Sequence, residues 1–178
     1  MNLFILRHAS AGERRQNPIL DRKRPLDKDG KRHCMQLAHV LNGLKIQFDL
    51  IISSPLKRSL QTASLVGTET GYESQILLSN ALAPEATFRD FQRLLSECRD
   101  YENVLVVGHN PNITQFLAAL LVPHNATSTP AIRLRKGSLA RLSLMRAPAM
   151  LQWLLDPRPV RVLYTTSTKS SRRKTSRK

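Results

Sequence analysis

Two arginines and two histidines in this sequence stand where apolar runs end. Arg7 and His8 follow the first apolar run, Arg58 comes just after a second, and His109 follows a later one. A guanidinium offers a fork of N–H donors that matches phosphoryl oxygens in shape and charge. A histidine beside it can act as a nucleophile, an acid or an anion binder. Together these residue types predict a phosphate site.

Two other interpretations of the same residues have to be weighed. Each histidine taken alone is compatible with a structural role, and each arginine with a solvated surface. Paired histidines also commonly bind zinc, but Arg7 next to His8 opposes a second cation, and neither histidine motif contains a cysteine or an acid. Cys34 and Cys98 have no CxxC partner, so we expect reduced, buried thiols and no metal.

The apolar pattern predicts the elements that position these groups. Apolar runs closed by small polar residues indicate buried strands, and apolar residues at helical spacing indicate amphipathic helices. Strands are expected at 3–6, 48–54, 75–79, 103–108, 137–144 and 150–155, helices around 34–44, 60–66, 88–100 and 113–121, and an irregular loop over most of 13–32.

The alternation of these elements predicts the fold class. Strands that alternate with helices form a mostly parallel sheet covered on both faces, and the final hairpin adds an antiparallel edge strand. We therefore expect a single three-layer α/β/α domain. Ligand sites in such sheets lie at the carboxyl ends of the strands, so the two arginines and two histidines should meet at one edge.

Length and charge suggest one domain and a tail. The 178 residues, 41% of them hydrophobic, suit a single core. The net charge of +15 is uneven, because residues 158–178 hold eight Lys or Arg and no acid. The stretch 165–178 has no apolar side chain with which to offset its ordering entropy. We expect a domain at 1–157 and a disordered basic tail at 158–178, the only part suited to nucleic acid.

The start of the chain and its hydropathy bear on location. Met1 opens directly onto the first apolar run, without a secretory leader, and no apolar run approaches the roughly 20 residues of a spanning helix. We expect a cytoplasmic monomer that does not contact a membrane.

Three motifs, in this order, resemble those of the histidine phosphatase superfamily, also called phosphoglycerate mutase-like. They are Leu6-Arg7-His8-Ala9, then Ser54-Pro55 with Arg58 and Gln61-Thr62-Ala63, then Gly108-His109-Asn110-Pro111. Within the superfamily the chain is similar to the small SixA-type phosphohistidine phosphatases, with which it shares Arg24-Pro25-Leu26 and a late strand containing Trp153. The resemblance covers about residues 3–156 and implies the phosphoglycerate mutase-like fold.

The resemblance implies a phosphoryl transfer in two steps. Neutral His8 attacks phosphorus and forms a phosphohistidine, which water then hydrolyses. Arg7, Arg58 and His109 hold the equatorial oxygens, where negative charge spreads as the leaving-group bond breaks. No metal or organic cofactor is required.

Four further positions follow from the same resemblance. Ala9 stands where the family signature has glycine, a change that small relatives accommodate. Arg24 and Asn110 are additional candidates for phosphate or substrate binding. Larger relatives place an acidic proton donor in a loop before the penultimate helix, and Glu85 is the candidate here. A P–N leaving group is readily protonated, so a weak acid favours phosphohistidine over alkyl phosphate esters.

These features lead us to expect a phosphatase that acts on phosphohistidine in a partner protein, such as a phosphorelay or phosphotransfer domain. The short chain leaves little room for the large capping insertions that select small substrates. The alternatives are a phosphomonoesterase acting on a small metabolite and a non-catalytic module that binds phosphate or, through the tail, nucleic acid.

Overall fold

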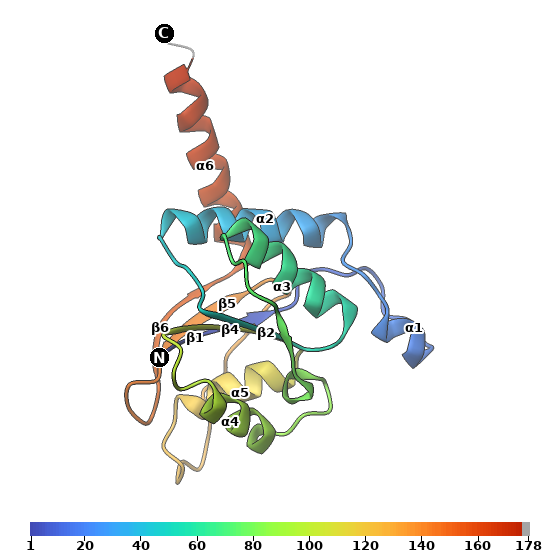
Figure 1. Cartoon of the computed structure of the whole chain (residues 1–178), viewed down its shortest axis with the longest axis vertical. Helices are drawn as coiled ribbons and strands as arrows, with labels where there is room; N and C mark the ends of the chain where they lie inside the picture. The colour runs from blue at the N-terminus through green and yellow to red at the C-terminus, as the bar shows by residue number, and fades with distance from the viewer. Residues whose placement is uncertain (176–178) are drawn as a thin grey trace.

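The structure, a computed structural model, describes residues 1–175 and is built on one six-stranded sheet. The strand order is β3-β2-β4-β1-β5-β6 (Figure 1). The parallel strands are β1 (Asn2–Arg7), β2 (Leu50–Ser53), β3 (Leu77–Leu78) and β4 (Asn103–Gly108), and the antiparallel ones are β5 (Leu139–Ser143) and β6 (Met150–Leu155). The predicted mostly parallel sheet with an antiparallel edge is confirmed.

Helices cover both faces of the sheet, as the three-layer prediction requires. One face carries α2 (Lys28–Gly43), α3 (Lys57–Glu69) and α6 (Pro157–Thr175), and the other carries the 3-10 turn η1 (Asn80–Leu82), α4 (Phe88–Glu97) and α5 (Asn112–Leu120) (Figure 1). A hydrophobic core lies on each face of the sheet, and alternate residues of β1 point into one or the other. Leu3 and Ile5 pack towards α4 and α5, and Phe4 and Leu6 pack towards α2 and α3.

Asp27 fixes the start of α2 and the loop that follows β1. Its Oδ1 accepts the backbone N–H of Gly30 at 2.7 Å, while its Oδ2 accepts the hydroxyl of Ser10 at 2.6 Å and the N–H of Gly12 at 2.7 Å. Asp27 is therefore the N-cap of α2. Gly30 lies so close to the carbonyl of Ser10 that a Cβ there would collide with it.

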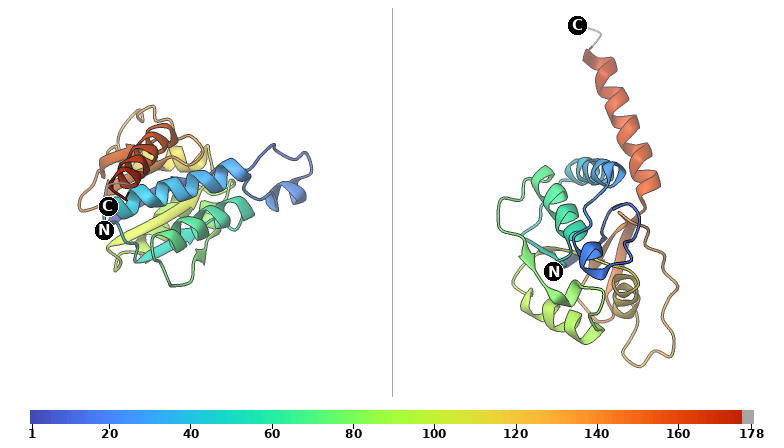
Figure 2. Two further views of the ribbon diagram at one scale, coloured as in Figure 1. Left: turned by 90° about the horizontal axis from the view of Figure 1, so that it is seen from above. Right: turned by 90° about the vertical axis from the view of Figure 1, so that its right-hand side faces the viewer.

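The predicted irregular loop before α2 contains one short helix, α1 (Pro18–Arg22). The side chain of Asn17 caps it by accepting the N–H groups of Ile19 and Leu20. No residue of α1 is buried, so it has no apolar stripe that could have predicted it. The loop projects beyond the end of α2, as the left view of Figure 2 shows.

Helix α6 differs from the predicted disordered tail. Val160 is 2% exposed and joins the core beside α2, and the rings of Tyr164 and His39 lie 5.0 Å apart. Ser167 Oγ lies 2.8 Å from His39 Nε2. Because these residues recur at helical spacing on one face, the first half of α6 belongs to the domain, which does not stop at residue 157. Residues 176–178 of the predicted tail lie outside the described residues.

Two further observations concern the thiols and membrane insertion. Cys34 and Cys98 are buried and free, as predicted, and burial raises the pKa of the Cys34 thiol to about 12. Within residues 1–175 no helix combines the length and the apolar character needed to cross a membrane.

Candidate active site

The strand register brings the two histidines together. β1 and β4 are adjacent parallel strands in which Arg7 lies opposite Gly108, so His8 and His109 leave neighbouring strands at the same edge. The backbone N–H of His8 donates to the carbonyl of Gly108 at 3.1 Å. The ring centroids of the two histidines are 4.9 Å apart. Residues far apart in the sequence therefore form one site, as the motif positions predicted.

His8 is held in the protonation state of a nucleophile. Its Nδ1 lies 2.8 Å from the carbonyl oxygen of Ala9, and because a carbonyl only accepts, this nitrogen carries the proton and Nε2 keeps its lone pair. Burial, opposed by that hydrogen bond and reinforced by the charges of Arg58 and Arg7, lowers the pKa of His8 to about 3. His8 is therefore neutral at neutral pH.

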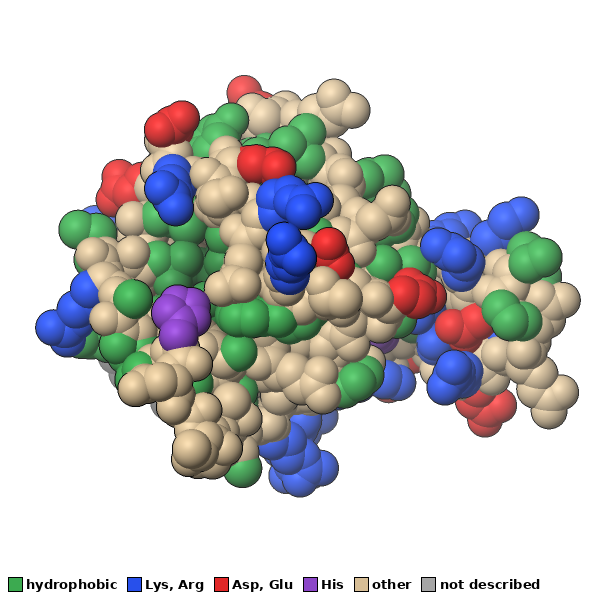
Figure 3. All heavy atoms as spheres, turned by 90° about the horizontal axis from the view of Figure 1, so that it is seen from below, with side chains coloured by type: hydrophobic (Ala, Val, Ile, Leu, Met, Phe, Trp, Pro, Cys, Tyr) green, Lys and Arg blue, Asp and Glu red, His purple; other side chains and the backbone are tan. Residues whose placement is uncertain are grey.

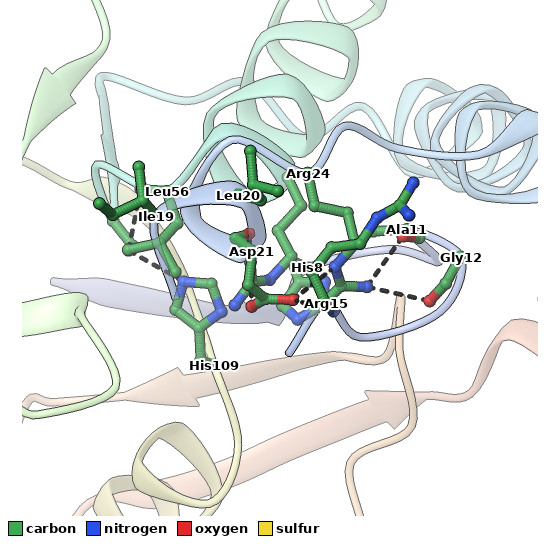
Figure 4. Close-up of polar contacts among 12 residues, drawn as sticks. His8, Ala11, Gly12, Arg15, Ile19, Leu20, Asp21, Arg24, Leu56 and His109 are labelled. Atoms are coloured by element: carbon green, nitrogen blue, oxygen red, sulfur yellow. Dashed lines mark hydrogen bonds and ion pairs between the residues drawn. The ribbon is translucent and has the colours of Figure 1, made fainter. Parts of the chain in front are cut away.

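His109 has one engaged and one open ring nitrogen. Its Nε2 lies 2.9 Å from the hydroxyl of Ser54, while its buried Nδ1 has no hydrogen-bond partner among residues 1–175. Figure 4 shows this ring with one nitrogen on the side of Asp21 and His8. Burial, followed by the nearby charges of His8 and Arg58, lowers the pKa of His109 to about 2. When Ser54 donates to Nε2, the proton sits on Nδ1 and can be offered to a phosphate oxygen.

Arg7, which is half-buried, and Arg58, which is buried, bring two guanidiniums to the histidines. Arg7 Nη1 donates to the carbonyl of Leu134 at 2.8 Å. The Nε atoms of both arginines are buried and have no hydrogen-bond partner in the part of the chain that the structure describes. Burial lowers the pKa of both, yet a guanidinium stays protonated in proteins. Cations whose buried Nε–H donors are open favour an anionic ligand.

Asp21 of α1 is the main counter-charge of this arginine cluster. Arg58 Nη1 donates to its backbone carbonyl at 2.9 Å and lies 3.3 Å from Oδ2. Arg24 Nε lies 2.9 Å from Oδ1, and Figure 4 shows these two residues side by side. Partial burial raises the pKa of Asp21, but the N–H of Arg15, the Arg24 bond and the charges of Arg24 and Arg58 outweigh it, so the pKa is lowered overall. Asp21 is therefore ionised and holds both arginines in place.

Arg24 and Asn110 line the same cleft but use their polar groups within the protein. Arg24 Nη1 donates to the carbonyls of Ala11 at 2.8 Å and Gly12 at 2.9 Å, besides the bond to Asp21. The Asn110 amide donates to the carbonyl of Leu134, and its oxygen accepts the Thr114 hydroxyl. In this arrangement both side chains shape the cleft.

The cleft around these groups has a volume of about 900 Å³ and a strongly cationic lining. Among the residues that the structure describes, two carboxylates line it, Asp21 and the predicted proton donor Glu85, together with seven cations. The cationic residues are Arg7, Arg14, Arg15, Arg22, Arg24, Arg58 and Lys136. Such a concentration of positive charge attracts phosphorylated substrates.

Sequence reasoning did not identify three contributors to this site. Asp21 lies in a loop rich in polar residues, where it does not stand out. The only signal in the sequence is its spacing of three residues from Arg24, which is typical of an ion pair on one helical turn. Ser54 belongs to the second of the three motifs, but the motif does not predict its hydrogen bond to His109. Lys136 comes from the loop before β5, and no local sequence pattern distinguishes it.

Among residues 1–175, no group of three or more His, Cys, Asp or Glu is arranged to hold a metal ion. A neutral imidazole can attack phosphorus while guanidiniums and a second imidazole surround the oxygens.

Comparison with known proteins agrees with this geometry. The family model described as "Histidine phosphatase superfamily (branch 1)" matches residues 3–83. An uncharacterised protein of Picosynechococcus sp. is 31% identical over 123 residues, which are 67% of this chain and 73% of that protein.

Two solved structures share the fold. The protein histidine phosphatase SixA, complexed with tungstate, is 24% identical with a TM-score of 0.78, covering 90% of this chain and 99% of that one. The α-ribazole phosphatase of Shigella flexneri is 18% identical with a TM-score of 0.66, covering 88% and 97%. The matched motifs supply Arg7, His8 and Arg58 to the cleft, and the chain belongs to the histidine phosphatase superfamily.

Proposed function

We propose that this phosphatase removes the phosphoryl group from phosphohistidine on a partner protein, through a phosphoenzyme on His8. The observation that carries the proposal is the hydrogen bond from His8 Nδ1–H to Ala9, which leaves the Nε2 lone pair free beside Arg7 and Arg58. Support for the substrate class comes from the fold shared with SixA, together with the wide cationic cleft.

The first step transfers the phosphoryl group to His8. The lone pair of Nε2 forms a bond to phosphorus while the P–N bond of the substrate breaks, and the departing imidazole nitrogen takes up a proton from water in the cleft. Arg7 and Arg58 stay charged throughout and stabilise the negative charge on the equatorial oxygens. His109 adds an N–H from Nδ1 on the side that faces His8.

The second step returns the enzyme to its starting state. A water molecule attacks the phosphorus of phospho-His8, the bond to Nε2 breaks, and inorganic phosphate leaves with the proton that water releases. The Ala9 carbonyl keeps Nδ1 protonated during both steps, so that Nε2 is again a free lone pair at the end.

A phosphomonoester of a small metabolite is the second candidate substrate. Glu85 lies on the wall of the cleft with His8 and His109, where it can protonate an alkoxide leaving group. The fold is also that of the α-ribazole phosphatase, so the fold alone does not separate the two substrate classes.

The test compares a histidine-phosphorylated phosphotransfer domain with p-nitrophenyl phosphate. We expect the wild type to release phosphate from the domain and His8→Ala to release none. Glu85→Gln should slow ester hydrolysis more than phosphohistidine hydrolysis, with Glu102→Gln, an exposed residue before β4, as the matched control. Hydrolysis of the ester alone by the wild type would refute phosphohistidine as the substrate.

A further inference from the structure

Helix α1 presents two apolar side chains to solvent at the edge of the active-site cleft. Ile19 is 66% exposed and Leu20 56% exposed, although α1 also contributes Asp21 and Arg22 to the cleft wall. Figure 3 shows hydrophobic side chains at the end of the projecting loop, with Lys and Arg side chains around them. Neither Ile19 nor Leu20 lines the cleft, so a small substrate inside it would not contact them.

The apolar pair is held in a defined position relative to the phosphate site. Asn17 caps α1 through its bonds to the N–H groups of Ile19 and Leu20. The next residue, Asp21, is bonded to Arg24 and Arg58, which line the cleft with it. A partner surface that binds α1 therefore lies at a fixed distance from Arg58, the arginine that faces the phosphoryl group.

The charge around α1 determines which kind of protein surface can bind to it. Residues 13–24 include five cationic side chains and two acids, and one of the acids, Asp21, is already paired with arginines. Arg14, Arg15, Arg22 and Lys23 are exposed around the apolar pair. A complementary surface is apolar at its centre and carries carboxylates at its rim.

We propose that α1 is the docking element for the phosphorylated partner protein. The partner presents its phosphohistidine beside a small apolar patch ringed by Asp or Glu, so that Ile19 and Leu20 cover the patch while the phosphoryl group enters the cleft. This inference rests on the proposed function, because it assigns the substrate's protein surface to a surface of the enzyme. It also explains why two large aliphatic side chains stay exposed on a helix that has no buried residue.

The double variant Ile19→Ser/Leu20→Ser tests the docking surface. With a histidine-phosphorylated phosphotransfer domain, we expect KM to rise about tenfold with kcat retained, because α1 binds the partner's apolar patch before the chemical step begins. With p-nitrophenyl phosphate, kcat and KM should both stay unchanged. The matched control is Val162→Ser/Leu163→Ser on α6, whose side chains are 61% and 51% exposed, and it should change neither substrate's kinetics.

A charge-reversal variant tests the cationic residues around Ile19 and Leu20. Lys23→Glu leaves the cleft wall intact, because Lys23 does not line it, yet it reverses one charge beside the apolar pair. We expect it to raise KM for the phosphorylated domain about threefold at low ionic strength, with the effect shrinking in high salt.

The outcomes separate the docking surface from the proposed function. An unchanged KM of the Ile19→Ser/Leu20→Ser variant for the phosphorylated domain overturns the docking role while phosphohistidine hydrolysis stands. An equal rise in the KM of this variant for p-nitrophenyl phosphate also overturns the docking role, since α1 would then shape the site and not bind the partner. A wild type that fails to dephosphorylate the domain but hydrolyses p-nitrophenyl phosphate refutes the proposed function itself.

Discussion

The buried, neutral histidines should make the stability of the folded protein depend on pH. The pKa of His8 is about 3 in the folded protein and about 6.5 when it is exposed, so between these values the unfolded chain binds more protons. The free energy of unfolding therefore rises with pH across this window, and this contribution is lost as the pH falls from above 6.5 towards 3. His109, with a pKa of about 2, acts in the same direction.

The size of the effect follows from proton linkage. Between pH 6 and pH 5 an exposed histidine is on average about 90% protonated while folded His8 stays neutral, which corresponds to about 1.2 kcal/mol for this one residue. Urea unfolding at these two pH values, in buffer without phosphate, should show the wild type losing about 1.2 kcal/mol more than His8→Asn. The measurement can follow the fluorescence of the single tryptophan, Trp153.

A control variant separates titration from general damage. Thr62→Val removes the hydroxyl that accepts the N–H of Ala9, next to His8, without removing a titratable group. It should lower stability equally at both pH values and keep the pH dependence of the wild type. An identical pH dependence in His8→Asn and the wild type would mean that His8 titrates normally, and the assignment of a neutral nucleophile would fail.

Three further changes have expected results. Arg58→Ala should lower kcat for p-nitrophenyl phosphate by roughly 10²–10³-fold, as the loss of one oxyanion donor does, and a loss below tenfold would contradict its role. Gly30→Ala should lower the free energy of unfolding by about 1–3 kcal/mol in urea titrations, because the added Cβ meets the backbone carbonyl of Ser10. The control Gly43→Ala, where the added Cβ enters open space, should not lower the free energy of unfolding. Ending the chain after Asp156 removes buried Val160 and should lower the free energy of unfolding by at least about 1.5 kcal/mol; equal stability of the truncated chain would show that α6 contributes nothing to the core.

The parts of the fold that the sequence predicts are those with a strong apolar pattern. The four-residue apolar runs before His8 and His109 predict strands buried on both faces, and their parallel pairing follows from the helices between them. Because parallel strands end at one edge, the meeting of the two histidines could be expected before any distance was known. The resemblance then implied that His8 is the histidine that attacks.

The parts that the sequence does not predict depend on contacts between distant residues. Asp21 lies in a loop rich in charge, where any of several residues could have been the partner of Arg58. The position of α6 depends on Val160 and Tyr164 packing on α2, which a count of polar residues in the last stretch does not reveal. The hydrogen bond that sets the tautomer of His8 is a matter of backbone geometry and has no sequence signal.

The most direct test of the central claim is to trap the phosphoenzyme. Wild type mixed with a slight excess of the phosphorylated phosphotransfer domain and quenched in alkali within milliseconds should carry phosphate on one residue, His8, attached at Nε2, as phosphopeptide mass spectrometry and ³¹P NMR can show. His109→Ala should carry the same modification with slower formation. Phosphate found on another residue, or release of phosphate at the wild-type rate by His8→Ala, would contradict the account.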